Sequence, residues 1–123
     1  MFCIKIKLKG YLKNVNENKT EIIDTSAIKR NNTICYTKDN TKHNIIIEND
    51  KIVLSRNNEE YSYELIFQKN KEYISEYYIK KLNTSINIRI ITNNLIVDDN
   101  KIEIKYKIID SEEEYIYFIE MNS

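Results

Sequence analysis

Apolar and polar residues alternate along most of the chain, and this period of two predicts β-strands. The segment 4–9 alternates isoleucine or leucine with lysine, as expected of a strand with one solvent-facing side. The same alternation runs through 86–90 and 101–108. The other segments with strand character are 21–29, 33–38, 44–48, 51–56, 61–68 and 115–121.

The connections between these segments are polar, and they lack the usual turn residues. The chain has no proline and one glycine, Gly10. We therefore expect the turns to depend on Asn and Asp, which tolerate left-handed backbone conformations. Asn49-Asp50, between two predicted strands, is typical of a tight hairpin. Gly10 lies inside the first strand, where a glycine often marks a bulge or a bend at a barrel corner.

The segment 70–83 leaves two interpretations open. The residues at helical spacing are Ile74, Tyr77, Tyr78 and Leu82. In a strand, one face would carry Tyr73, Ser75, Tyr77 and Ile79. We favour the strand because it agrees with the hairpins on either side.

Eight to ten short strands joined by short turns predict a single all-β domain across the 123 residues. A sandwich and a closed barrel both fit this pattern. Sequential hairpins favour an antiparallel up-and-down β-barrel, because closure removes exposed strand edges. At about eight strands the interior is either filled by side chains or holds one small ligand.

Composition and charge exclude several classes of function. Hydrophobic residues make up 41% of the chain, and 19 basic residues balance 19 acidic ones. This neutrality argues against a nucleic-acid partner, which would need clustered cations. The start of the chain has no continuous apolar run, so we expect no signal peptide, no membrane partner and a cytoplasmic location. Cys3 and Cys35 lack metal-ligand spacing, and we expect reduced thiols rather than a disulfide.

Six segments in order resemble one known family. They are Ile6-Lys7-Leu8-Lys9-Gly10, Ile34-Cys35-Tyr36, Val53-Leu54-Ser55-Arg56, Glu64-Leu65-Ile66-Phe67, Ile88-Arg89-Ile90-Ile91-Thr92 and Ile104-Lys105-Tyr106. In their order and spacing they resemble the YwiB-like family of uncharacterised bacterial proteins. That resemblance implies a calycin-type, lipocalin-like β-barrel, and it implies no activity because the family has none established.

The chain departs from the family pattern at its turns. Family members carry a glycine-bearing turn, often with a Thr-Pro step, near the segment 79–84. Here that turn reads Lys80-Lys81-Leu82-Asn83, and Ala27 and Asn57 stand where small residues are expected. The chain is therefore similar to a divergent member of the family.

Arg56 is the first candidate for a binding residue. It shares phase with Ile52 and Leu54, so an inward face for these two would point Arg56 into the barrel mouth. Its guanidinium would suit a carboxylate or another anion, since it offers a bidentate fork. The structural alternative is an arginine that closes one end of the barrel. Asp24 is a candidate partner, although a solvated carboxylate fits it as well.

Four tyrosines share faces with aliphatic residues and are candidates to line a cavity. They are Tyr36, Tyr63, Tyr106 and Tyr117. Their rings would form apolar walls and their hydroxyls would orient a ligand. The alternative is that they are core rings whose hydroxyls reach the rim.

No motif indicates catalysis, a metal site or a cofactor. His43, the only histidine, falls in the polar connector 39–44, and we expect a solvated turn residue. Cys35 has no histidine nearby to activate it, and the acidic run 112–114 lacks the spacing of a calcium loop.

These observations predict a non-enzymatic barrel that binds a small apolar or amphipathic ligand in its interior. The alternative is a solid-packed barrel that serves as a protein-interaction or homodimerisation module, which the apolar segment 115–121 would suit. An enzymatic function would require Arg56 and Asp24 to meet in one cavity.

Overall fold

The computed structural model describes residues 3–122, which form ten strands, while Met1, Phe2 and Ser123 lie outside the described residues. The strands are β1 (Cys3–Asn14), β2 (Lys19–Arg30), β3 (Thr33–Lys38), β4 (Thr41–Ile47), β5 (Lys51–Asn57), β6 (Tyr61–Gln68), β7 (Glu72–Ile79), β8 (Thr84–Val97), β9 (Lys101–Ile108) and β10 (Glu113–Asn122). Each strand pairs with its neighbour in sequence, and β1 closes the ring on β10. The predicted antiparallel up-and-down β-barrel of eight to ten strands is confirmed.

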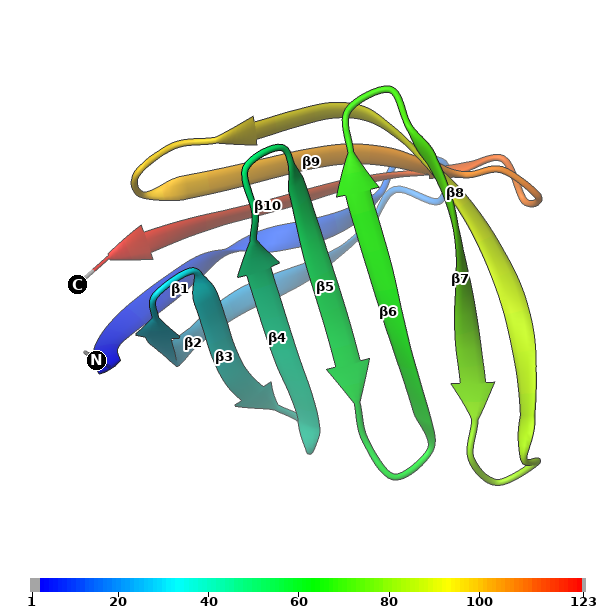
Figure 1. Ribbon diagram of the computed structural model, residues 1–123, viewed down its shortest axis with the longest axis horizontal. Helices are drawn as coiled ribbons and strands as arrows, with labels where there is room; N and C mark the ends of the chain where they lie inside the picture. The colour runs from blue at the N-terminus through cyan, green and yellow to red at the C-terminus, as the bar shows by residue number, and fades with distance from the viewer. Residues whose placement is uncertain (1–2, 123) are drawn as a thin grey trace.

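The barrel is flattened into two layers that cross. In Figure 1, β3 to β7 run steeply, β9, β10, β1 and β2 run almost horizontally, and β8 rises steeply beside β7 before it bends into the horizontal direction. The layers separate at two places, because β2 pairs with β3 only over Ile28–Arg30 and β6 pairs with β7 only over Tyr61–Tyr63. These two short ladders leave more space between the layers than a uniform barrel would.

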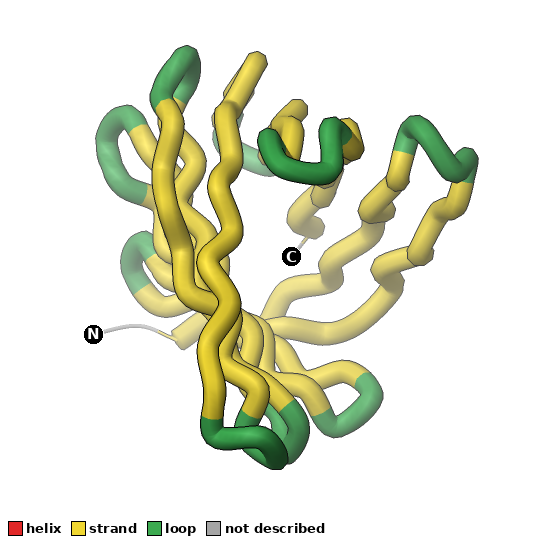
Figure 2. Tube along the Cα trace, turned by 90° about the vertical axis from the view of Figure 1, so that its right-hand side faces the viewer, coloured by secondary structure: helices red, strands yellow, loops and turns green. Residues whose placement is uncertain are grey.

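The segment 70–83 contains strand β7, so the strand interpretation is confirmed and the helical alternative is wrong. Ser75 is buried, Tyr73 and Tyr77 are half-buried, and Ile74 on the opposite face is 64% exposed. Every described residue in Figure 2 belongs to a strand or a loop. No helix within residues 3–122 is long and apolar enough to cross a membrane.

The turns use Asn and Asp as expected. Residues with positive φ, other than glycine, are Asn18, Asn31, Asp39, Asn40, Asn70, Asn83 and Glu112. All but Glu112 are Asn or Asp, whose short side chains lower the cost of the left-handed conformation.

The connector predicted at 39–44 is shorter in the structure than expected. The polar stretch 39–44 is a two-residue turn, Asp39-Asn40, after which β4 begins at Thr41. Both turn residues have positive φ, which is the geometry of a tight hairpin. His43 consequently lies in a strand, where the alternation of side chains points it inward.

Aliphatic side chains fill one end of the barrel. The apolar side chains with almost no exposure are Leu8, Ile34, Ile45, Ile52, Phe67, Ile90, Ile102, Ile104 and Ile119. Most of them lie in the halves of the strands next to the β2–β3, β4–β5, β6–β7 and β8–β9 connections. Each buried side chain of this size contributes roughly 1.5–3 kcal/mol. This packed end stabilises the barrel, so the opposite end can carry aromatic and polar side chains in its interior.

Gly10 allows the closest approach between two strands. The ladder between β1 and β10 continues through Gly10 and Ile119 without a register shift, so a bulge at this glycine is wrong. A β-bulge occurs instead in β8, between Thr92 and Asn94. A Cβ atom at position 10 would lie 1.8 Å from the carbonyl oxygen of Phe118, so only glycine fits where β1 crosses β10.

We predict that Gly10→Ala destabilises the protein by about 2 kcal/mol or more, because backbone atoms of β10 would have to move. Urea unfolding measures the loss. Lys9→Ala, at the neighbouring exposed position, is the control and should change stability by less than about 0.5 kcal/mol. An unchanged unfolding midpoint for Gly10→Ala would contradict the close approach of the two strands.

Candidate functional site

Five inward side chains form a row across five neighbouring strands. They are Tyr36 on β3, His43 on β4, Arg56 on β5, Tyr63 on β6 and Tyr77 on β7, each directly opposite the next. Because side chains on one face of an antiparallel ladder lie side by side, the row is continuous. We call it the Arg56 row.

An aliphatic row lies next to the Arg56 row on the same strands. Ile34, Ile45, Leu54 and Leu65 are also directly opposite one another, two residues further toward the packed end. All four are buried. The barrel interior therefore changes from aliphatic to aromatic and polar side chains over two residues along each of these strands.

Aromatic rings surround Arg56 within its row. Tyr36 stacks on His43 with ring centroids 4.4 Å apart and planes tilted by 3°. On the other side, Tyr63 stacks on Tyr77 at 5.2 Å, and Tyr61 stacks on both. The guanidinium thus occupies the register position between an imidazole and a phenol ring.

Three more tyrosines face this row from β9 and β10. Tyr106 stacks on Tyr115 with centroids 5.3 Å apart and packs against Phe67 of the core at 4.8 Å. Tyr117 is only 2% exposed. The structure therefore brings Tyr36, Tyr63, Tyr106 and Tyr117 into the same interior as Arg56, on two opposing walls.

Burial keeps the tyrosine hydroxyls protonated. It raises the pKa of Tyr63 to about 12 and also raises the pKa of Tyr36, Tyr106 and Tyr117. The positive charge of Arg56 opposes the rise in pKa at all four, which places the four hydroxyls within its electrostatic reach. Neutral hydroxyls remain able to donate hydrogen bonds.

Arg56 lines a groove of about 460 Å³, which also carries Glu64 and Glu76, and two cavities. Of the two cavities, the larger has a volume of about 270 Å³ and the smaller of about 150 Å³. The larger is lined by Leu12, Arg56, Tyr63, Leu65, Tyr77, Ile88, Ile90, Tyr106, Ile108 and Tyr115. The smaller is lined by Glu21, Ile23, Tyr36, Lys38, Asp39, Thr41, His43, Arg56 and Tyr61. Arg56 is the one charged side chain on the larger cavity and lies between an apolar space and a polar one.

Glu21 and Asp39 line the smaller cavity together with Arg56, yet neither forms an ion pair with it. The Nε atom of Arg56 is buried without a hydrogen-bond partner, and no carboxylate within residues 3–122 forms an ion pair with it. An unmade hydrogen bond of this kind costs about 1–3 kcal/mol. The hydroxyl of Tyr117 is buried near that of Tyr36 and makes no hydrogen bond of normal geometry. The Nε–H of Arg56 is therefore an unused donor in a partly desolvated place.

Asp24 does not pair with Arg56, and the alternative interpretation of a solvated carboxylate is the one observed. Asp24 is exposed on the outer face of β2, opposite Lys9 of β1. The inner face of β2 instead carries the residues of opposite phase, with Ile23 and Ala27 buried. Glu21 shares that phase, lines the smaller cavity, and its charge acts on Arg56 without forming an ion pair. The enzymatic interpretation, which needed Arg56 and Asp24 in one cavity, loses its basis.

The expectation of a solvated His43 is also wrong. Its side chain is buried in the Arg56 row, with 9% of its surface exposed. Burial, followed by the positive charges of Arg56 and Lys38, lowers the pKa of His43 to about 4. At neutral pH the imidazole is uncharged, so Arg56 is the only charge in its row.

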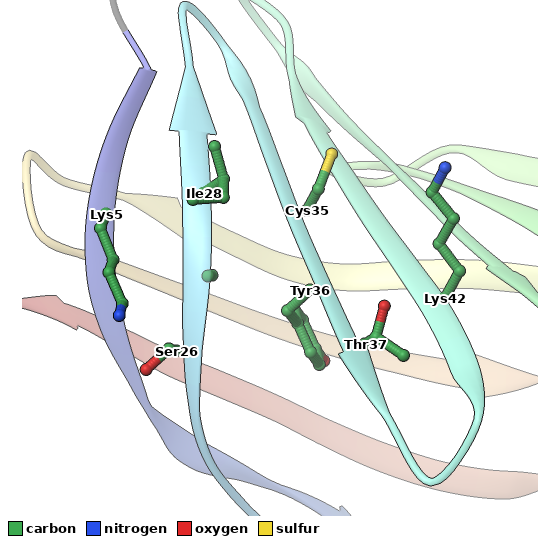
Figure 3. A pocket seen from close by; sticks show the side chains of 8 residues that line it. Lys5, Ser26, Ile28, Cys35, Tyr36, Thr37 and Lys42 are labelled. Carbon is green, nitrogen blue, oxygen red and sulfur yellow. The ribbon is translucent and has the colours of Figure 1, made fainter.

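A separate groove of about 330 Å³ lies where β2 and β3 diverge. Figure 3 shows Lys5, Ser26 and Ile28 on one side of it and Cys35, Thr37 and Lys42 on the other. Tyr36 lines both this groove and the smaller interior cavity, so its ring separates the two. The Nζ of Lys38 donates to the carbonyl oxygen of Ile22 across the gap, in place of strand pairing.

No metal-ligand cluster forms within residues 3–122, since no three His, Cys, Asp or Glu side chains come together there. Both cysteines are free thiols, with Cys3 exposed and Cys35 half-buried. The chemistry available at the Arg56 row is therefore hydrogen bonding, charge and apolar contact.

The low pKa of His43 predicts a pH-dependent stability. The unfolded chain binds the imidazole proton below about pH 6.5 and the folded chain only below about pH 4. Between these values the unfolded state binds more protons, so stability falls as the pH falls. We expect a loss of about 2 kcal/mol between pH 7 and pH 5, measured by urea unfolding.

The control for this prediction is His43→Phe, which keeps a ring stacked on Tyr36 and removes the titration. Its stability should change much less over the same pH interval, because the carboxylates titrate mainly at lower pH. Equal slopes for the wild-type protein and His43→Phe would contradict the buried, neutral imidazole.

Two tyrosine hydroxyls in different surroundings predict different effects of removal. The hydroxyl of Tyr117 is buried near that of Tyr36 but makes no hydrogen bond of normal geometry, so Tyr117→Phe should change stability little. Tyr73→Phe deletes a hydroxyl that donates to Gln68 Oε1 at 2.6 Å, and should cost about 1 kcal/mol. Thermal and urea unfolding measure both. A larger loss for Tyr117→Phe than for Tyr73→Phe would show that Tyr117 has a partner.

Comparison with known proteins adds a structural neighbour. No protein-family model matches the chain, and no curated protein matches it significantly. The crystal structure of the ywiB protein from Bacillus subtilis is similar, with a TM-score of 0.72 over 98% of this chain and 91% of that chain. The two sequences are 13% identical, a level at which the likeness concerns the fold alone. The chain thus has a YwiB-like β-barrel fold, as the resemblance in its sequence implied.

Proposed function

We propose that this barrel binds one small apolar or amphipathic molecule in the larger cavity beside Arg56. The observation that supports the proposal is the unequal filling of the interior. Almost fully buried aliphatic side chains pack together at one end, whereas the tyrosine-lined end has a cavity of about 270 Å³. Interiors of folded proteins are normally close-packed, so a cavity of this size is a feature to be explained.

The lining and the size indicate the kind of ligand. Leu65, Ile88, Ile90 and Ile108 supply apolar walls, and tyrosine hydroxyls supply the few polar groups that orient a bound molecule. Ligand pockets commonly measure about 300–1,000 Å³. A cavity of about 270 Å³ lies just below that range and suits a single ring or a short branched chain rather than a long lipid.

We extend the proposal to the class of barrel and to the cellular compartment. Next-neighbour strand order and an interior cavity support a calycin-type, lipocalin-like binding barrel, although with ten strands rather than the eight of lipocalins. Two free thiols support a reducing compartment, consistent with the cytoplasm. The interior offers a guanidinium, tyrosine hydroxyls and apolar walls, which suit the binding of a small molecule.

We predict that filling the cavity abolishes binding. Ile88→Phe adds a ring to the cavity wall, while Ile74→Phe, its control, adds the same ring at a position that is 64% exposed. Amide NMR titration with p-cresol, a small ring with one hydroxyl, should shift signals of cavity-lining residues in the wild-type protein and in Ile74→Phe. The shifts should vanish in Ile88→Phe.

Native mass spectrometry of the purified wild-type protein is the complementary measurement. A retained small-molecule mass that is lost on denaturation would agree with the proposal. Absence of such a mass, together with no p-cresol shifts in the wild-type protein, would contradict it.

A second candidate, self-association, is supported by an apolar row on the outer face. Ile22, Tyr11 and Phe118 are directly opposite one another on β2, β1 and β10, and Ile22 is 63% exposed. Lys9 and Glu120 pair beside this row, so charges of both signs border it. Such a mixed surface suits a second copy of itself in a symmetric dimer. Sedimentation at micromolar concentration that shows only a 14.8 kDa monomer would contradict this candidate.

A further inference from the structure

We infer that the ligand of the larger cavity is a small monocarboxylate with an apolar body, whose carboxylate binds the Arg56 guanidinium. The inference rests on the proposed function and specifies the chemical class of the ligand. It is drawn from the charge, hydrogen bonding and lining of the space around Arg56.

The first observation is that Arg56 forms no ion pair with a carboxylate, whereas another arginine of the same barrel does. Arg89, on the outer face of β8, bonds Glu72 at 2.7 Å and lies 3.8 Å from Asp110. Arg56 is half-buried, its Nε has no partner, and no ion pair involves it among residues 3–122. Natural proteins pair their buried charges, so an unpaired one at a cavity indicates that its partner is not part of the chain.

The second observation is that none of the ring side chains next to Arg56 carries a negative charge at neutral pH. The neighbouring His43 is uncharged at neutral pH, since burial and nearby cations lower its pKa to about 4. Burial keeps the hydroxyls of Tyr36, Tyr63 and Tyr117 protonated by raising their pKa. The Nε of Arg56 is buried without a partner. An anion would supply the acceptor that this group lacks.

The third observation selects a carboxylate attached to an apolar body. The guanidinium fork matches the two oxygens of a carboxylate, and such bidentate pairs are among the stronger hydrogen-bonded contacts in proteins. The larger cavity has Arg56 as its single charged lining residue, with aliphatic and tyrosine side chains around it. One charge at the wall of an apolar cavity fits a molecule with one charge at one end.

The smaller cavity on the other side of Arg56 limits the negative charge of the ligand. It is lined by Glu21 and Asp39 as well as by Lys38. The two carboxylates disfavour a second anionic group on that side, since like charges repel strongly where water is scarce. A dicarboxylate or a doubly charged phosphate should therefore bind less well than a monocarboxylate.

The test compares phenylacetate with phenylacetamide, which have the same shape and differ in charge. Isothermal titration at neutral pH should show phenylacetate binding the wild-type protein at least about tenfold more tightly. Arg56→Gln should remove this preference and leave weak binding of both probes. Arg89→Gln, a control at the paired outer arginine, should keep the preference. Thermal unfolding of each variant checks that it is folded.

The possible outcomes separate the inference from the proposed function. Equal affinity of the two probes for the wild-type protein would overturn the inference while the binding barrel stands, and this comparison holds even if Arg56→Gln fails to fold. Tighter binding of phenylphosphonate than of phenylacetate would overturn the monocarboxylate class. Binding of neither probe, with no p-cresol shifts, would overturn both the inference and the proposed function.

Discussion

The unpaired guanidinium of Arg56 is the feature on which the functional interpretation of this barrel depends. Antiparallel register places it in the interior, between His43 and Tyr63, where the outer carboxylate of Asp24 cannot reach it. Its charge acts on the buried tyrosine hydroxyls and contributes to the low pKa of His43. A half-buried charge without a partner is costly, so the site is stable mainly because the rest of the barrel holds it in place.

The packed end of the barrel provides that support. One residue pair away from the Arg56 row, the same strands carry Ile34, Ile45, Leu54 and Leu65 in register. Gly10 lets β1 and β10 approach closely and close the ring, and the short ladders at β2–β3 and β6–β7 let the two layers separate. The fold thus combines a rigid aliphatic end with an end where large rings leave space, which suits a binding site built on strands rather than on loops.

The sequence predicted the strands and turns because both depend on local patterns. Alternation indicated most of the strands, agreement with the neighbouring hairpins favoured β7, and the shortage of glycine indicated turns made by Asn and Asp. His43 was predicted in a turn because the polar stretch around it resembles a loop. The symmetry of the hairpin would have placed it correctly. Tyr36 and His43 lie equally far from the turn Asp39-Asn40, so a two-residue turn there makes them partners. The size of the cavity was beyond prediction, because its volume depends on ring packing and on where β6 and β7 separate.

The most direct test of the account is the NMR signal of the Arg56 Nε–H group, assigned by its loss in Arg56→Lys and followed as phenylacetate is added. The account predicts a signal protected from exchange with water, since this nitrogen is buried, and a marked shift when a carboxylate binds it. A signal that stays unchanged while phenylacetate shifts other residues of the cavity would show that Arg56 is a structural arginine and not the anchor of a ligand.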